Sequence, residues 1–146
     1  MLTEKERVTN LIEDYYKVNS FMHLCGIKIE AVSCGAISLG LDIDAAKHMN
    51  VNSGVHGGLI ATIADNSLGV CAASVGKRVV TISTYLQFIS VVREGEHIHT
   101  EARIVHQEGK LMLIQVDVKS GERLVLSSQS QMFIIGDFEG IPEKWE

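Results

Sequence analysis

A chain of 146 residues, 46% of them apolar and 21% charged, is typical of a globular protein, and we assign residues 1–146 to a single domain. The net charge of -5 and the lack of a basic block argue against nucleic-acid binding, and no apolar run approaches the roughly 20 residues of a membrane span. The first ten residues, MLTEKERVTN, look like neither a signal peptide nor a transit peptide, so a cytoplasmic location is expected.

The first expected element is an amphipathic helix over residues 3–18. Thr3 followed three residues later by Glu6 is a capping-box pattern. The apolar residues of this segment recur at helical spacing and therefore share one face. Asn19 and Ser20 are expected to end the helix.

Two strands and a long helix are expected next. Residues 27–32 and 36–43 alternate between apolar and polar, and Gly35 supplies the turn between them. Residues 44–55 are polar and rich in turn formers, which indicates a loop. The apolar segment 56–74 contains no proline and is long enough for a helix wrapped by protein.

From residue 78 onward the pattern alternates with a period of two, which predicts strands in the segments VVTISTYLQFISV, HIHTEARIV, KLMLIQVDVK and RLVLSSQSQMF. In the first of them Val80, Ile82, Leu86 and Phe88 would form the apolar face. Short loops that contain glycine separate the segments and favour an antiparallel meander. Together the elements predict an α+β fold in which one long antiparallel sheet covers a central helix.

The start of the central helix and its single carboxylate raise a functional question. Gly57 and Gly58 would expose the first helical N–H groups to an anion or a carbonyl oxygen, or they merely form a tight junction between loop and helix. Asp65 is the only charged residue of the segment and is expected to be buried. It would then be a structural hydrogen-bond acceptor, for example beside Asn66, or a general base or nucleophile.

The spacing of these residues has a consequence for assembly. Asp65 follows Gly57 by about 12 Å along a helix that rises about 1.5 Å per residue. A carboxylate at that distance does not reach an atom held at the N–H of its own Gly57. If both groups serve one reaction, they come from different chains, which predicts a two-fold homodimer with composite active sites.

These residues resemble those of a known family. Asn50, the stretch His56-Gly57-Gly58 and Asp65 have the order and spacing found in the hotdog-fold acyl-CoA thioesterases, in their PaaI-like and THEM2-like branch. The resemblance covers nearly the whole chain, including the strand VVTISTYLQF that follows the helix. It implies a hotdog fold, hydrolysis of acyl-CoA thioesters without a metal or an organic cofactor, and a homodimer or a homotetramer.

The resemblance also implies roles for single residues. The N–H of Gly57 would polarise the thioester carbonyl, and Asp65 of the partner subunit would act as general base on water or as nucleophile. Asn50 would help to place the water or the thioester, and Thr81 would help to orient the water. His56 would support the loop and contact the region of the thioester.

Further residues are expected to contact the substrate. They are Gly58, Asn52, Val55, Asn66, Ser83 and Tyr85. Asn52 is the alternative to Asn50 for the polar role in the loop, although the spacing favours Asn50. The family often has a proline in a YL.P pattern after the central helix, whereas this sequence reads YLQF and has its only proline at Pro142.

Other chemistries have less support in the sequence. His97 and His99 share one strand face and could form a metal pair, but no third ligand is evident, so we expect surface histidines and no metal site. Cys71 could be a nucleophile, yet it lies among Val and Ala without a histidine partner. The main alternative function is a non-catalytic hotdog module that binds acyl-CoA as a sensor. Nothing in the sequence identifies the acyl group.

Overall fold

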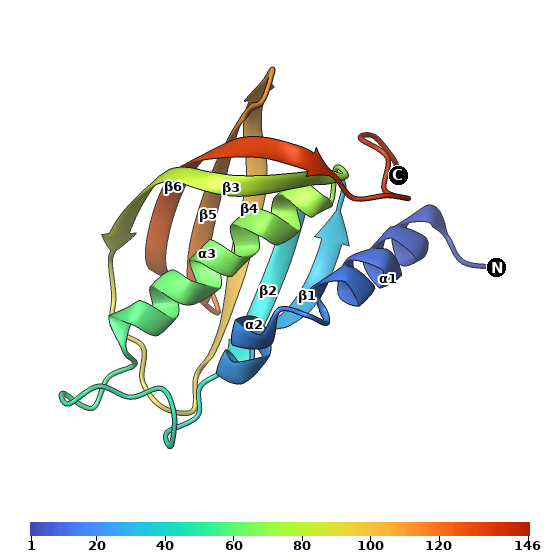
Figure 1. The fold of residues 1–146 in the computed structure, drawn as a ribbon. Coiled ribbons are helices and arrows are strands. Elements are labelled where there is room, and N and C mark those ends of the chain that lie inside the picture. Colours follow the sequence, from blue (N-terminus) through green and yellow to red (C-terminus); the bar gives the residue numbers. More distant parts are fainter.

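The computed structural model describes all residues from 1 to 146, and Figure 1 shows their fold. The elements follow one another in the order α1, α2, β1, β2, α3 and then β3 to β6. Their bounds are α1 Glu4–Tyr16, α2 Ser20–Cys25, β1 Lys28–Ser33, β2 Ala36–Asp42, α3 Gly57–Ala73, β3 Lys77–Phe88, β4 His97–Glu108, β5 Leu111–Ser120 and β6 Arg123–Asp137. None of these helices combines the length and the apolar character needed to cross a lipid bilayer.

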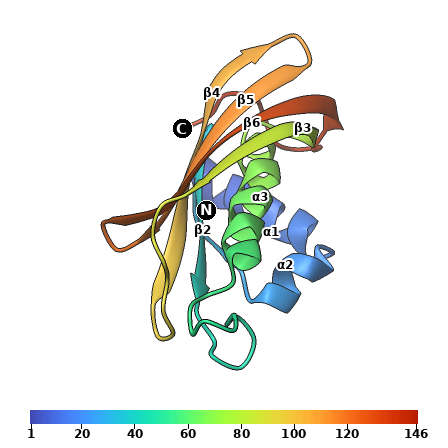
Figure 2. The same cartoon turned by 90° about the vertical axis from the view of Figure 1, so that its left-hand side faces the viewer.

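All six strands form one antiparallel sheet with the order β1-β2-β4-β5-β6-β3. The sheet curls around α3, and α1 and α2 lie on the same side of the sheet as α3 (Figure 1, Figure 2). The core fills the space between α3 and the sheet, where Ile63, Leu68 and Ile114 are almost completely buried. The predicted α+β fold, a long antiparallel sheet around a central helix, is therefore confirmed.

The position of β3 differs from the predicted meander. β4, β5 and β6 are neighbours as expected, but β3 pairs with β6 at the edge of the sheet, and β4 pairs with β2. α3 crosses the sheet and delivers the chain to the β6 edge, so the segment 89–96 has to return before β4 begins. The meander prediction is wrong for β3 because alternation identifies a strand but not its partner.

The N-terminal segment forms two helices instead of one. The capping box of α1 is present as predicted, since Thr3 and Glu6 exchange hydrogen bonds between side chain and backbone. Asn19 does not simply end this helix. Its Oδ1 accepts the N–H of Met22 at 3.1 Å, which makes Asn19 the N-cap of the short helix α2.

A β-bulge changes the direction of the side chains in β3. Thr81 pairs with Met132 and Ser83 pairs with Gln131, so Ile82 is the extra residue between them. Beyond the bulge Phe88 lies opposite the buried Leu126, on the α3 side of the sheet.

The apolar face that alternation predicts for β3 is therefore split. Leu86 and Phe88 face the α3 side, whereas Val80 lies opposite the exposed Phe133, and Ile82 itself is exposed in the bulge. Strict alternation fails here because the bulge shifts the phase of the strand by one residue.

Candidate functional site

The first turn of α3 has one backbone N–H group without a partner. His56 is the N-cap residue, and its Nδ1 accepts a hydrogen bond from the N–H of Gly58 at 3.1 Å. The N–H of Gly57 donates to no group of the chain. A free N–H at this place lies at the positive end of the helix dipole and can hold an oxygen that gains negative charge.

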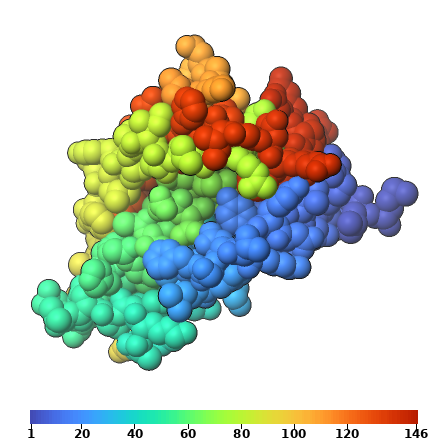
Figure 3. Space-filling view, in the orientation of Figure 1, coloured from blue at the N-terminus to red at the C-terminus, as the bar shows by residue number.

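The loop 44–55 before α3 forms a projection at one end of the molecule (Figure 3). The buried ring of His48 holds this loop: its Nδ1 accepts the N–H of Asp44 at 2.8 Å, and its Nε2 donates to the carbonyl oxygen of Cys25 at 3.1 Å. The carbonyl of His48 accepts the N–H of His56 at 2.8 Å. Sequence reasoning assigned no role to His48, and its partner in α2 is too distant along the chain to give a local signal.

Asn50 folds the tip of this loop. Its Oδ1 accepts the N–H groups of Asn52 at 2.8 Å and of Gly54 at 3.1 Å, and its own N–H donates to the Gly54 carbonyl at 2.7 Å. The Nδ2 group of Asn50 has no partner in the chain and remains a donor. Asn52 is exposed and Val55 is buried, with its N–H bonded to the Val92 carbonyl. Asn50 is half-buried, and its polar role in the site stays a prediction.

Asp65 is exposed in the single chain, which corrects the expectation that it is buried. It lines a pocket on the flank of α3, together with Tyr16 of α1 and Thr81 of β3. Protein atoms on one side displace water and raise the pKa of Asp65 above its ordinary value. No hydrogen bond or ion pair offsets this cause.

The structural alternative for Asp65, a hydrogen bond with Asn66, is not formed. The amide of Asn66 donates to the Thr62 carbonyl at 2.9 Å and accepts from Nδ2 of Asn19 at 3.1 Å. The carboxylate is thus left without a structural partner. An unpaired carboxylate with a raised pKa in a pocket is a candidate acid or base.

The pocket beside Asp65 has a volume of about 290 Å³ and includes Thr81, which brings these two predicted residues together. Tyr16 of α1 also lines this pocket. Burial raises the pKa of Tyr16, so its hydroxyl stays protonated. Gly69 makes room for Tyr16, because a Cβ at residue 69 would lie 2.6 Å from the hydroxyl oxygen. Sequence reasoning missed Tyr16 at this site, since contacts between α1 and α3 have no local signal.

The predicted site residues fall into three groups in the single chain. The group at the start of α3 consists of Asn50, Asn52, Val55, His56, Gly57 and Gly58. The second group consists of Asp65 and Asn66, about two turns further along α3, and of Thr81 on β3.

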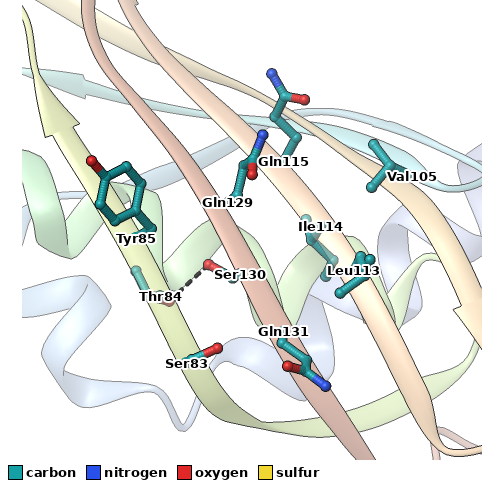
Figure 4. Close-up of a pocket in the computed structure, with 10 residues that line it drawn as sticks. All are labelled: Ser83, Thr84, Tyr85, Val105, Leu113, Ile114, Gln115, Gln129, Ser130 and Gln131. Atoms are coloured by element: carbon teal, nitrogen blue, oxygen red, sulfur yellow. Dashed lines mark hydrogen bonds between the residues drawn. The ribbon is translucent and has the colours of Figure 1, made fainter.

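The third group is formed by Ser83 and Tyr85. They lie on the outer face of the sheet, the face that points away from α3. They line a shallow pocket of about 380 Å³ together with Gln129 and Gln131 (Figure 4). The bulge at Ile82 explains this position, because it turns Ser83 and Tyr85 away from the helix side. Within one chain, these two residues do not meet the other predicted site residues.

The other candidate groups are engaged elsewhere. Burial raises the pKa of the Cys71 thiol to about 12, and its Sγ donates to the carbonyl of Gly35 at 3.6 Å, so this thiol is not a nucleophile at neutral pH. His97 contacts Asp42 through Nδ1 at 2.8 Å and Glu30 through Nε2 at 2.9 Å. It is therefore a partly exposed member of a carboxylate–histidine cluster across β1, β2 and β4.

Comparisons with known proteins identify the family and the fold of this chain. Residues 52–127 match a family described as the thioesterase superfamily. A candidate esterase from Archaeoglobus fulgidus is 23% identical over 92% of this chain and 88% of its own length. The E. coli PaaI protein of the phenylacetic acid degradation operon superposes with a TM-score of 0.86 at 17% identity, over 93% of this chain and 99% of its own.

A further solved structure holds a ligand. A hypothetical thioesterase protein from Streptococcus pneumoniae, solved with coenzyme A, superposes with a TM-score of 0.73 at 22% identity, over 77% of this chain and 91% of its own. The sheet and central helix described above are thus those of the hotdog fold.

Proposed function

Because this chain belongs to the thioesterase superfamily, we propose that it hydrolyses acyl-CoA thioesters to the free acid and CoA, with no metal or organic cofactor. The observation that carries the proposal is the N–H of Gly57, which donates to nothing and stands at the positive end of α3. This donor polarises the thioester carbonyl and stabilises the oxyanion that forms on it. One such donor contributes a factor of about 10²–10³ to kcat in other acyl-transfer enzymes.

Asp65 of the partner subunit supplies the second half of the site. It acts as general base on a water molecule or attacks the carbonyl carbon as nucleophile. In the first case the water oxygen bonds to the carbonyl carbon, the carboxylate takes the proton, and the C–S bond breaks to release CoA. Thr81 shares the pocket with Asp65 and orients the water. The raised pKa of Asp65 makes it a better base than an ordinary aspartate.

The remaining residues position the substrate at the start of α3. The free Nδ2 donor of Asn50 places the thioester or the water, and His56 holds the first turn through Gly58. The main chain from Asn52 to Gly58 lines the approach to the carbonyl. Asn66, Ser83 and Tyr85 complete the substrate contacts in the assembled protein.

The composite site requires a homodimer, and the edge strand β3 supports one. β3 is 12 residues long, lies at the edge of the sheet, and exposes Val80, Ile82 and Phe88. A long apolar edge strand left uncovered would pair with other chains and aggregate. Pairing of two such edges would extend the sheet across both subunits, and two dimers would form the homotetramer.

The test is the release of free CoA thiol from a panel of aromatic, short and long acyl-CoAs. Asp65→Asn should reduce kcat about 10²–10⁴-fold, because it removes the base and keeps the size of the side chain. Asp14→Asn is the matched control, since Asp14 pairs only with Lys17 on the surface of α1. Full activity of Asp65→Asn would disprove the role of this carboxylate. Binding of acyl-CoA by the wild type without turnover would disprove hydrolysis and favour the alternative function, a non-catalytic acyl-CoA sensor.

A further inference from the structure

The ring of Phe88 lies against the start of α3. Phe88 is the last residue of β3, and the bulge at Ile82 directs its side chain to the α3 side of the sheet. The position that a Cβ of Gly57 would occupy is 3.5 Å from Cε1 of the ring, 3.9 Å from Cδ1 and 4.0 Å from Cζ. One edge of the ring therefore fills the space beside the glycine whose N–H is free.

The rest of this ring is open to solvent in the single chain. Phe88 is 57% exposed, although the strand pairing with Leu126 fixes its backbone. Ile89 and Val91, which follow it, are exposed as well. Apolar side chains beside a single unpaired polar donor are the usual composition of a ligand site.

The place of the ring determines what it touches in a bound thioester. A thioester whose oxygen accepts the Gly57 N–H would place its carbonyl carbon at the start of α3, where the ring lies. The two neighbours of that carbon, the sulfur and the α-carbon of the acyl group, then lie along the ring. An aromatic edge is a favourable neighbour for sulfur, and a rigid ring leaves little space for a branch on the α-carbon.

We propose that Phe88 is a specificity-determining residue that forms the apolar wall of the carbonyl site and selects acyl groups unbranched at the α-carbon. This inference rests on the proposed thioesterase function. It assigns a role to a residue that the predicted site did not include, and the ring lies within van der Waals contact of the Cβ position of Gly57.

The first measurement compares butanoyl-CoA with its α-branched isomer 2-methylpropanoyl-CoA. The wild type should prefer the unbranched substrate, and Phe88→Ala should reduce the ratio of the two kcat/KM values about 10-fold, which is the effect of one methyl group in an apolar pocket. Phe88→Tyr should keep the wild-type ratio, because it keeps the ring. Phe133→Ala is the matched control, since Phe133 lies on the outer face of the sheet.

The second measurement is the binding of free CoA and of the ketone analogue of butanoyl-CoA, in which CH2 replaces the sulfur and hydrolysis is impossible. Phe88→Ala should weaken binding of the ketone about 10-fold and leave that of free CoA unchanged, because only the ketone has a carbonyl and an acyl group. Equal weakening for both ligands would indicate a merely structural role and overturn the proposal. Phe88→Leu repeats the test with a smaller loss of packing.

The two proposals fail in different ways. An unchanged ratio and an unchanged ketone affinity in Phe88→Ala, with turnover abolished by Asp65→Asn, would remove Phe88 and leave the thioesterase intact. A wild type that neither turns over an acyl-CoA nor binds the ketone would disprove the proposed function and, with it, the role of Phe88.

Discussion

Gly69 of α3 allows a sharp test of how α1 is fitted against the central helix. Replacing a helical glycine by alanine usually stabilises a helix by about 1 kcal/mol. Here the new Cβ would lie 2.6 Å from the hydroxyl oxygen of Tyr16 and 3.7 Å from Cζ of the same ring. Only the first distance is a clash. The clashing atom is the far end of the Tyr16 side chain, whose ring lies near Phe138 with 6.3 Å between the ring centroids, so relief of the clash requires this ring to shift.

The magnitude follows from these two opposing effects. Overpacking of this kind costs about 1–3 kcal/mol, so Gly69→Ala should change stability by between zero and a loss of about 2 kcal/mol. In a Tyr16→Phe background the hydroxyl is gone, and the same substitution should stabilise by up to about 1 kcal/mol. The coupling free energy between the two substitutions should therefore be about 1–3 kcal/mol.

The assay is urea unfolding of the four proteins of this cycle, followed by circular dichroism at one fixed protein concentration. A second cycle with Tyr15→Phe is the control, since the hydroxyl of Tyr15 donates to the Glu139 carbonyl at 2.7 Å and does not touch Gly69. Its coupling should stay below about 0.5 kcal/mol. An equally small coupling in the Tyr16 cycle would refute the explanation of Gly69.

Three further outcomes are expected. The acidic limb of the kcat/KM profile should lie above the usual aspartate range. Neighbouring protein atoms displace water and raise the pKa of Asp65, so activity is lost as the pH falls through this pKa. A limb in the ordinary range would contradict Asp65 as the base. His56→Ala should lower the free energy of unfolding by about 0.5–2 kcal/mol in urea titrations, since the N–H of Gly58 loses its cap, and an unchanged value would contradict the capping role. The thiol of Cys71 is buried and its pKa is raised to about 12, so it should react with Ellman's reagent at pH 8 only after unfolding. Cys25 and Cys34 are partly exposed. Rapid loss of all three thiols in the native protein would contradict the burial of Cys71.

Local sequence signals predicted the elements of the fold well. The capping box at Thr3 and Glu6, the uncharged start of α3 and the alternation in β5 all act over a few residues, and each element forms where it was expected. The choice of partner for β3 is not local. It depends on α3, which ends beside the β6 edge of the sheet, and the alternation of apolar and polar residues carries no information on this position.

The candidate site was predicted in part for the same reason. The loop and the first turn of α3 are contiguous in sequence, so the structure brings Asn50, His56 and Gly57 close together, while the roles that the resemblance implies for them stay predictions. The hydrophobic surroundings of Asp65 in the sequence suggested burial, but a helix that is covered by a sheet on one side still has an outer flank. Tyr16 reaches that flank from α1 across about 50 residues of chain, a contact that only tertiary packing creates.

The free N–H of Gly57 belongs to the main chain, and this affects how the site can change during evolution. Mutation of a side chain cannot delete a backbone donor, and only proline at residue 57 would remove it. Every other substitution there leaves the donor and adds a Cβ toward the ring of Phe88. The donor is therefore present wherever the helix is present. Relatives that diverge in substrate have to change the residues that surround this N–H group. The residues around the first turn are free to vary the substrate while the same hydrogen bond is kept.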